Sequence, residues 1–549
     1  MAKDTREKKK AGEEMLDPAQ EVGKADNNNS DSSEKTVEKK SAVKNGIVRM
    51  VLVLLSILLE VVVIFLLLHY LGSKAGWVYS VLHILSIILV LVIYGSHKTA
   101  SVRMTWIMLI MLVPIVGTVL FLIIGLNWHT LQMRKRYSEL DKILLPLLPP
   151  NEEVSRHVRE KSGRLSGISA YLKKNAGFPV YENTKVTYYD DGLKGLNAQL
   201  EELAKAERFI FMEYHAIEDA ESWHEIQKVL VERAKAGVEV RIFYDDMGSI
   251  GFINTNFVKK MESLGLKCRV FNPFAPGFNF FLNNRDHRKI TVIDGRVGFT
   301  GGYNLANEYF HRTEPYGFWK DTGVKLEGDA VQSLTVIFLE MWNAISKYDV
   351  DDKDFRQFLT SPPSPEGKGF VQPYADSPMD GIAVGEDVYM SIAEGATEYA
   401  WYITPYLIIT DEMNHVLSLA AMRGVDVRII TPGIPDKKMV YSLTRSYYNG
   451  LARHGVRIFE FTPGFCHAKM SVSDDLVATC GTINMDYRSL YHHFENGCLL
   501  ADCDAVMDIK HDFEETFAQC REVTDYYVTG RGAFMRFGQM LLRLAAPLM

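Results

Sequence analysis

Two His-x-Lys motifs carry the residue types that phosphodiester chemistry uses. His287, Lys289 and Asp294 are followed after six residues by Gly301-Gly302-Tyr303-Asn304. His467, Lys469 and Asp474 are followed after six residues by Gly481-Thr482-Ile483-Asn484. One His-x-Lys arises often by chance, whereas two copies with matched downstream intervals are a strong signal. These histidines, lysines and aspartates form the candidate catalytic set.

The residue types indicate how such a site would work. In a strand, positions two apart share a face, so each histidine projects into the same cleft as its lysine. If the two motifs meet, both lysines together with Asn304 and Asn484 offer donors to the phosphate oxygens of one phosphodiester. One imidazole then attacks phosphorus, and the other protonates the leaving alkoxide. This chemistry requires no metal or other cofactor, and the sequence has no carboxylate cluster typical of a two-metal site.

Carboxylates near the motifs have two expected roles. A histidine base works best when a carboxylate holds its second ring nitrogen. Asp321 and Glu495, which each follow a Gly-x-x-Asn segment, are the candidates for that role. Asp294 and Asp474 are expected to brace the motif loops through hydrogen bonds rather than to contact substrate.

Other polar and aromatic residues fit a structural role at least as well as a functional one. We expect His492 and His493 to be structural or exposed, and His215 to line or support the cleft. Tyr406 and Asn283-Asn284 either shape a substrate pocket or simply pack. The aromatic run 278–281 meets either lipid or the core.

The chain around the motifs is duplicated. RAKAGVEVRIFYDD (233–246) is repeated as AAMRGVDVRIITPG (420–433), and GLKCRVF (265–271) is echoed by GVRIFEF (455–461). Short β-rich runs alternate with helical stretches, which indicates an α/β fold. We therefore predict two similar domains, at 137–348 and 381–549, joined by a linker at 349–380 that is rich in Pro, Ser and Asp. Pseudo-twofold packing of these domains would bring the motifs together.

The N-terminal part predicts a membrane anchor. Residues 1–45 form a polar tail, and residues 46–136 hold the anchor. Apolar stretches at about 50–71 and 77–95 are long enough to span a bilayer. Glu60 is the one formally charged residue of the first stretch, and we expect its carboxyl group to be protonated or hydrogen-bonded. A third stretch, 105–126, contains Pro114 and Gly117 and either spans or re-enters. By the distribution of basic residues, re-entry places the catalytic region in the cytoplasm and a full span places it outside.

The composition of the chain limits which molecules it is expected to bind. A formal charge of -7 and a pI near 6.1 argue against a protein that coats nucleic acid, so no nucleic-acid partner is expected. The six cysteines show no zinc-ligand spacing and are expected to be reduced thiols, with a Cys498–Cys503 disulfide as the alternative. The tail at 534–544 is either an amphipathic helix at the membrane surface or a packing helix.

The paired HxKx4Dx6G[GT]xN pattern resembles the phospholipase D superfamily, and the surrounding sequence resembles bacterial cardiolipin synthases. The stretches that carry this resemblance are TWIMLIMLVPIVGTVLFLIIG, HRKITVIDGRVGFTGGYNLANEY, WKDTGVKLEG, ITPYLIITDE, GFCHAKMSVSDD, GTINMDYRSLYHHFENG and FMRFGQMLLRLAAPLM. Departures from the wider superfamily are small: Gly302 stands where Ser is common, and the second motif has Thr482.

The resemblance implies a multi-pass protein of the bacterial cytoplasmic membrane that acts on phosphatidylglycerol. One molecule would donate its phosphatidyl group, glycerol would leave, and a second molecule would accept the group to give cardiolipin. By family analogy, His287 is the nucleophile and His467 the acid/base. The alternative is a hydrolase with the same site, a phospholipase or membrane-bound nuclease, in which water replaces the lipid hydroxyl. A scaffold that lacks activity is disfavoured because both motifs are intact.

Overall fold

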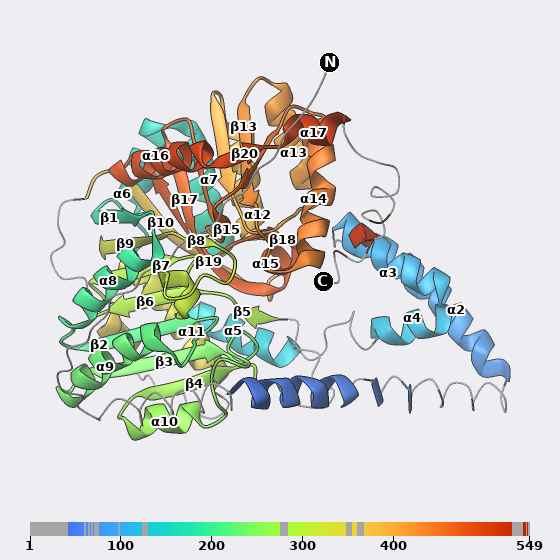
Figure 1. Ribbon diagram of the computed structural model, residues 1–549, viewed down its shortest axis with the longest axis horizontal. Helices are drawn as coiled ribbons and strands as arrows, with labels where there is room; N and C mark the ends of the chain where they lie inside the picture. Colours follow the sequence, from blue (N-terminus) through green and yellow to red (C-terminus); the bar gives the residue numbers. More distant parts are fainter. Residues whose placement is uncertain are drawn as a thin grey trace, which may run out of the picture.

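The computed structural model shows two α/β halves with a helical leader beside them (Figure 1). It describes residues 42–529 except 57, 60–61, 64–65, 67–69, 71–75, 97–98, 123–129, 275–283, 347–353 and 360–366, and after 529 only residues 538, 542–544 and 546. The predictions for Glu60, Asn283, the run 278–281 and most of the tail at 534–544 therefore lie outside the described residues.

The first half is a seven-stranded mixed sheet in the order β1-β9-β7-β6-β2-β3-β4. Its strands are β1 (Thr184–Tyr189), β2 (Phe209–Tyr214), β3 (Glu239–Asp245), β4 (Lys267–Phe271), β6 (Lys289–Ile293), β7 (Val297–Gly301) and β9 (Gly323–Gly328). Its helices are α8 (Gly192–Leu203), α9 (Glu221–Lys235), α10 (Phe257–Ser263) and α11 (Val331–Ile345), with a 3-10 turn η6 (Asn307–Phe310).

The second half repeats this order strand for strand as β10-β19-β17-β16-β11-β13-β14 and adds β20 at the end. Its strands are β10 (Phe370–Asp376), β11 (Tyr399–Ile403), β13 (Asp426–Pro432), β14 (Arg457–Phe461), β16 (Met470–Ser473), β17 (Val477–Gly481), β19 (His493–Ala501) and β20 (Cys520–Glu522). Its helices are α12 (Val384–Gly395), α13 (Asp411–Met422), α14 (Lys438–Ala452), α15 (Tyr487–Tyr491), α16 (Asp504–Ala518) and α17 (Thr524–Thr529). The predicted α/β duplication is confirmed.

The repeated sequence segments form the same structure in both halves. In each, a helix ends two residues before a glycine, and a buried parallel strand follows: α9 leads to β3 and α13 leads to β13. Gly237 has φ 95° and Gly424 has φ 98°. This left-handed conformation ends a helix at little cost only for glycine, so the glycine of each repeat fixes the turn into the strand.

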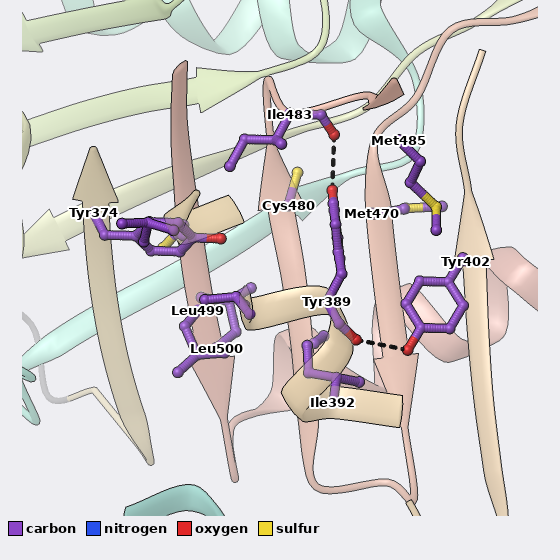
Figure 2. Packing of buried hydrophobic residues seen from close by; sticks show 14 of the residues in the cluster. Tyr374, Tyr389, Ile392, Tyr402, Met470, Cys480, Ile483, Met485, Leu499 and Leu500 are labelled. Atoms are coloured by element: carbon purple, nitrogen blue, oxygen red, sulfur yellow. Dashed lines mark hydrogen bonds between the residues drawn. The ribbon is translucent and has the colours of Figure 1, made fainter. Parts of the chain in front are cut away.

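Helix α12 packs on the second sheet and supports the turn that carries the second motif (Figure 2). The hydroxyl of Tyr389 donates to the carbonyl of Ile483 at 2.8 Å, and the hydroxyl of Tyr402 donates to the carbonyl of Tyr389 at 3.1 Å. All three side chains are buried. Tyr389 therefore holds the turn before Asn484, and Tyr402 in turn holds Tyr389, within an apolar layer.

The two halves exchange short strands beside their motifs. Strand β5 (Arg285–Asp286) pairs in parallel with the start of β19, and β8 (Phe318–Lys320) pairs in parallel with β15 (Gly464–Cys466). One apolar core cluster runs through both halves. The face-to-face packing that the sequence analysis required is thus built from paired backbone as well as from side chains.

The leader is helical. Its apolar helices pack on one another and project away from the two halves, whereas its last helix packs on α11 (Figure 1). Residues 42–56 are helical, and α2 (Gly76–Tyr94), α3 (Ala100–Leu112), α4 (Pro114–Leu120) and α5 (Leu131–Leu144) follow. As predicted, the third apolar stretch breaks at Pro114. A Cβ on Gly117 would lie 2.7 Å from the Cα of Ile110, so α4 folds back tightly on α3. Within the described part of the chain, no helix has the length and apolarity that a bilayer crossing requires.

The predicted linker, 349–380, is too long. Residues Phe370–Asp376 form β10, which pairs with residues 495–501 of β19 and closes one edge of the second sheet. The run FVQPYAD contains a proline. Proline argues against a strand in the sequence, although an edge strand such as β10 tolerates it, so this strand was not predicted. The first part of the predicted domain 137–348 also reaches the second half, because Arg164 on α7 (Gly163–Tyr171) pairs with Asp474 at 2.7 Å. The remaining short elements are α6 (Glu152–Lys161), η3 (Leu145–Leu147), η4 (Leu172–Ala176), η7 (Phe355–Phe358), β12 (Leu407–Ile408) and β18 (Met485–Asp486).

Candidate active site

The two motif histidines enter the site at equivalent points of the two halves. His287 lies between β5 and β6, and its backbone N–H donates to the carbonyl of Phe494 at 2.9 Å. His467 lies between β15 and β16, and its N–H donates to the carbonyl of Lys320 at 2.7 Å. The backbone of each histidine is therefore fixed by the opposite half, as the pseudo-twofold arrangement requires.

The orienting carboxylates are crossed in the same way. The Nδ1 of His287 lies 3.0 Å from the carboxylate of Glu495, and the Nδ1 of His467 lies 2.7 Å from Asp321. Both carboxylates are fully buried. The sequence analysis named these two carboxylates without assigning either to a histidine, and the structure pairs each with the motif of the other half. With Nδ1 held, Nε2 is the ring nitrogen left for chemistry.

The motif lysines lie against the histidine carbonyls. Lys289 Nζ donates to the carbonyl of His287 at 2.6 Å. Lys469 Nζ donates to the carbonyl of His467 and lies 2.7 Å from its Nδ1. Burial lowers the pKa of Lys289 to about 7 and that of Lys469 to about 8. A phosphate anion between them would reverse part of that shift, because it stabilises both charged forms.

Both imidazoles are held in the neutral form. Burial, and then the charge of Lys289, keep the pKa of His287 well below its usual range. Burial, and then Lys469, lower the pKa of His467 to about 3. Lys469 and His467 also contribute to the lowered pKa of His287, so the two motifs share one electrostatic field. A neutral imidazole has the free lone pair that a nucleophile or a base needs.

The two motif asparagines differ in how they are engaged. Asn304 accepts from the N–H of Ala216 at 3.1 Å and donates to the hydroxyl of Tyr309 at 2.8 Å. The Asn304 amide therefore stabilises the first half, and one of its two N–H groups is already donated to Tyr309. The Oδ1 of Asn484 is buried without a hydrogen-bond partner. An amide oxygen cannot donate to a phosphate oxygen, so the predicted phosphate contact of Asn484 requires its Nδ2.

Asp294 and Asp474, which belong to the candidate catalytic set, are not at the site. Each lies at the far end of the motif strand, in a tight turn with φ of 56° and 54°. Asp294 accepts from three consecutive N–H groups at 2.7–2.9 Å, and Asp474 accepts from its three counterparts at 2.8–3.0 Å. They brace the start of β2 and of β11, the strands that pair with the two motif strands, so their role is structural.

The residue after the first glycine of each Gly-x-x-Asn segment affects how an orienting carboxylate is held in position. A Cβ on Gly302 would lie 2.0 Å from Oδ1 of Asp321, so a side chain there would displace that carboxylate. In the second half the hydroxyl of Thr482 donates to Glu495 at 2.5 Å. The two departures from the superfamily pattern therefore correspond to two different ways of holding a carboxylate.

Two histidines that the sequence analysis treated as supporting lie beside His287. The ring of His215 is 4.9 Å from it and the ring of His493 is 5.5 Å away, measured between centroids. His493, expected to be structural or exposed, also places its Nδ1 3.5 Å from Oε1 of Glu495. Since it stands two positions before Glu495 on β19, strand periodicity would have placed both on one face.

One group among the described residues combines metal-ligand types within 4.8 Å: His287, His493 and Glu495. The hydrogen bonds of Glu495 to His287 and Thr482 account for its position as an orienting carboxylate.

The other candidate pocket residues have packing partners. Asn284 donates to the carbonyl of His492 at 3.0 Å, and the hydroxyl of Tyr406 donates to the carboxylate of Asp436 at 2.5 Å. Both therefore have packing partners. Cys498 and Cys503 form no disulfide, and all six thiols are free, as expected.

The chain matches known proteins over most of its length. The family model for "Cardiolipin synthase, PLD-like domain" matches residues 200–342 and 389–519, and a model for a domain of unknown function matches residues 5–136. A cardiolipin synthase of Geobacillus thermodenitrificans is 31% identical over 87% of this chain and 95% of its own length. Cardiolipin synthase 2 of Bacillus cereus is 30% identical over 83% of this chain and 89% of its own.

Two further comparisons bear on sequence and fold. An uncharacterized protein of Streptococcus mutans is 41% identical over 84% of this chain and 99% of its own length. The crystal structure of phosphatidylserine synthase from Haemophilus influenzae shares the fold, with a TM-score of 0.53 at 14% identity over 69% of this chain and 97% of that one. The matched residues contain both motifs and both orienting carboxylates. The chain therefore belongs to the phospholipase D-like cardiolipin synthase family.

Proposed function

We propose that the protein is a membrane-anchored phosphatidyltransferase that makes cardiolipin and glycerol from two molecules of phosphatidylglycerol. The crossed pairs His287–Glu495 and His467–Asp321 carry this proposal. They provide two neutral, oriented imidazoles with Lys289 and Lys469 in the same electrostatic field. That arrangement suits a phosphodiester attacked from one side and released on the other.

The reaction proceeds in two half-reactions with balanced protons. Binding of the anionic phosphodiester raises the pKa of His467, which takes up a proton at Nε2 before cleavage. Nε2 of the neutral His287 then attacks phosphorus, the P–O bond to the glycerol headgroup breaks, and the departing alkoxide takes that proton from His467. In the second half-reaction His467 takes the proton from a hydroxyl of the acceptor lipid. The acceptor oxygen then attacks phosphorus and the P–N bond to His287 breaks. The lysines stabilise the negative charge that develops on the phosphate oxygens in both steps.

The leader supports a membrane location. Most of the exposed large apolar residues belong to the helices before residue 132, for example Leu59, Leu91 and Met111, which are 64%, 65% and 69% exposed. Surfaces of this kind are stable when lipid covers them. The α3–α4 hairpin supports re-entry of the third stretch. Together with the distribution of basic residues, re-entry favours a cytoplasmic location of the catalytic halves in a bacterial membrane. Protease accessibility of the catalytic region in sealed cells tests this: cleavage of intact cells would reject the cytoplasmic side.

Product analysis tests the activity. Purified protein in phosphatidylglycerol micelles should release glycerol and form cardiolipin in equal amounts. Phosphatidic acid as the main product would instead support the hydrolase. His287→Ala and His467→Ala should both abolish turnover without loss of folding, and unchanged turnover in either variant would reject the mechanism. A substrate with an activated leaving group should label His287 in the His467→Ala variant, because the acid is then not needed for cleavage.

A further inference from the structure

Helix α5 carries Tyr137 to the segment that holds His287. The helix begins within the predicted anchor and packs on α11 of the first half. The side chain of Tyr137 is buried, and its ring lies 5.4 Å from the ring of Phe494, measured between centroids. Phe494 directly precedes Glu495, and its carbonyl accepts the backbone N–H of His287 at 2.9 Å. The last helix of the leader therefore contacts the same short segment that fixes the first catalytic imidazole.

Arg288 connects Tyr137 to the backbone of Glu495. One terminal N–H group of its guanidinium donates to the hydroxyl of Tyr137 at 2.8 Å, and its Nε–H donates to the carbonyl of Glu495 at 3.2 Å. The guanidinium also lies 3.6 Å from the carboxylate of Glu213 and 5.4 Å from the ring centroid of Phe494. The side chain of Arg288 is completely buried. Because a guanidinium is planar, a partner that fixes one of its N–H groups also fixes the direction of the others.

The hydroxyl of Tyr137 is held on its other side by α11. It donates to the carboxyl group of Glu340 at 3.1 Å. Burial raises the pKa of Tyr137 well above its usual value, so the hydroxyl keeps its proton. Burial opposes the charge of Arg288, but Tyr137, Glu213 and Asp286 raise the pKa of Arg288 above its usual value. A neutral phenol can accept from one group and donate to another, so Tyr137 joins the charged Arg288 to α11.

The sequence of the second motif allows no counterpart of this link. Arg288 is the middle residue of the first His-x-Lys motif, and Ala468 is the middle residue of the second. The side chain of alanine has no hydrogen-bond donor, so it cannot bind the backbone of the other orienting carboxylate, Asp321. The two motifs share their chemistry, which therefore does not require an arginine at this position. The link serves only the side of the site that holds His287.

We propose that Tyr137 is a positioning residue, which acts through Arg288 on Glu495 and so sets the orientation of the nucleophile His287. This inference rests on the proposed phosphatidyl transfer, in which His287 attacks phosphorus. The carbonyl that Arg288 holds and the carboxylate that holds His287 belong to the same residue, so a shift of that backbone moves the carboxylate. A reacting group displaced by about 1 Å can lose roughly 10²-fold in rate. Catalysis then requires α5, which follows the anchor in the chain, to be docked on α11.

Tyr137→Phe tests the link, because it removes one hydroxyl and keeps the ring. Glycerol release from phosphatidylglycerol micelles is measured in wild type, Tyr137→Phe, Glu495→Gln and the double variant. In Tyr137→Phe, kcat should fall roughly 5- to 50-fold while KM stays within about twofold, since the motif lysines are unchanged. In the Glu495→Gln background the same substitution should change kcat by less than about twofold, because the carboxylate that it positions is already absent.

Tyr181→Phe is the matched control. The hydroxyl of Tyr181 is buried and also bonds to α11, at Ser333 with a distance of 3.0 Å, but neither residue contacts Arg288. This variant should lose some stability and keep the wild-type kcat. An equal fall of kcat in Tyr181→Phe and Tyr137→Phe would overturn the proposal, because a weakened attachment of α11 would then explain both.

Two other results would overturn it. One is a kcat of Tyr137→Phe that equals that of wild type, and the other is a double variant in which the effects of Tyr137→Phe and Glu495→Gln multiply. If Tyr137→Phe does not fold, Arg288→Lys decides: it keeps the charge but not the guanidinium that holds both partners, and an unchanged kcat would overturn the proposal. Wild-type protein that releases glycerol but forms phosphatidic acid would refute the transferase function and leave this inference intact.

Discussion

The Nδ1 of His287 lies 3.0 Å from the carboxylate of Glu495, which stands 208 positions further along the chain in the other half. The reciprocal pair, His467 with Asp321, spans 146 positions. Each half thus supplies the carboxylate that orients the imidazole of its partner. A half expressed alone would hold a histidine without its orienting group, so catalysis depends on the docking of the halves as well as on the motifs.

Glu495→Gln should reduce kcat by roughly 10²–10⁴-fold, because an amide cannot stabilise the same tautomer and charge of His287. The expected loss lies in glycerol release, the half-reaction in which His287 attacks. The rate of glycerol release, measured in samples quenched at successive times, gives this loss. Glu153→Gln is the matched control, because the Glu153 side chain is 76% exposed. A kcat within twofold of wild type would show that the carboxylate does not orient the nucleophile.

The sequence was sufficient for features that depend on local spacing. The motif intervals identified His287 and His467, and the repeated glycines at 237 and 424 fixed the same helix-to-strand turn in both halves. Pro114 predicted the break between α3 and α4 because proline cannot continue a helix.

The sequence was insufficient where long-range packing decides the outcome. Nothing local assigns Glu495 to His287 rather than to His467, which is far closer in the chain. His493 could have been placed by strand period relative to Glu495, but its approach to His287 requires β5 to pair with β19. Strand β10 was missed because a Pro-containing edge strand lacks the usual signal.

Gly302→Ser should lower kcat by roughly 10²-fold, since its Cβ would lie 2.0 Å from Oδ1 of Asp321 and displace the carboxylate from His467. Steady-state assays give the loss. Gly163→Ser is the matched control because a Cβ there meets no atom within 4 Å. Full activity of Gly302→Ser would mean that Asp321 can move without affecting His467.

Asp474→Ala should lower the free energy of unfolding by about 2–4 kcal/mol, since it removes hydrogen bonds to three N–H groups and to Arg164. Burial opposes the charge, but the N–H groups of Tyr399, Thr397 and Glu398 hold the pKa of Asp474 below its usual value. Its contribution is therefore complete above the unfolded pKa and is lost as pH falls through the folded one.

Denaturant titration at neutral pH measures the effect of Asp474→Ala. Asp508→Ala, at an exposed position on α16, is the control and should change stability little. The folded fraction of Asp474→Ala should retain kcat, because the carboxylate lies at the far end of the motif strand. A large fall in kcat with unchanged stability would return Asp474 to the catalytic set.

The motif lysines should give the reaction an alkaline limit. Burial lowers the pKa of Lys289 to about 7 and that of Lys469 to about 8, so raising pH through this range removes their charges from the free enzyme. An enzyme without these charges binds a phosphodiester weakly, and kcat/KM should fall between about pH 7 and 9. Bound phosphate raises both pKa values, so the fall in kcat itself should occur at higher pH. Initial rates measured across this range at saturating and at low substrate separate the two profiles. If both lysine pKa values were near 10 in the free enzyme, kcat/KM would not fall up to pH 9. That result would contradict the prediction that burial lowers both pKa values.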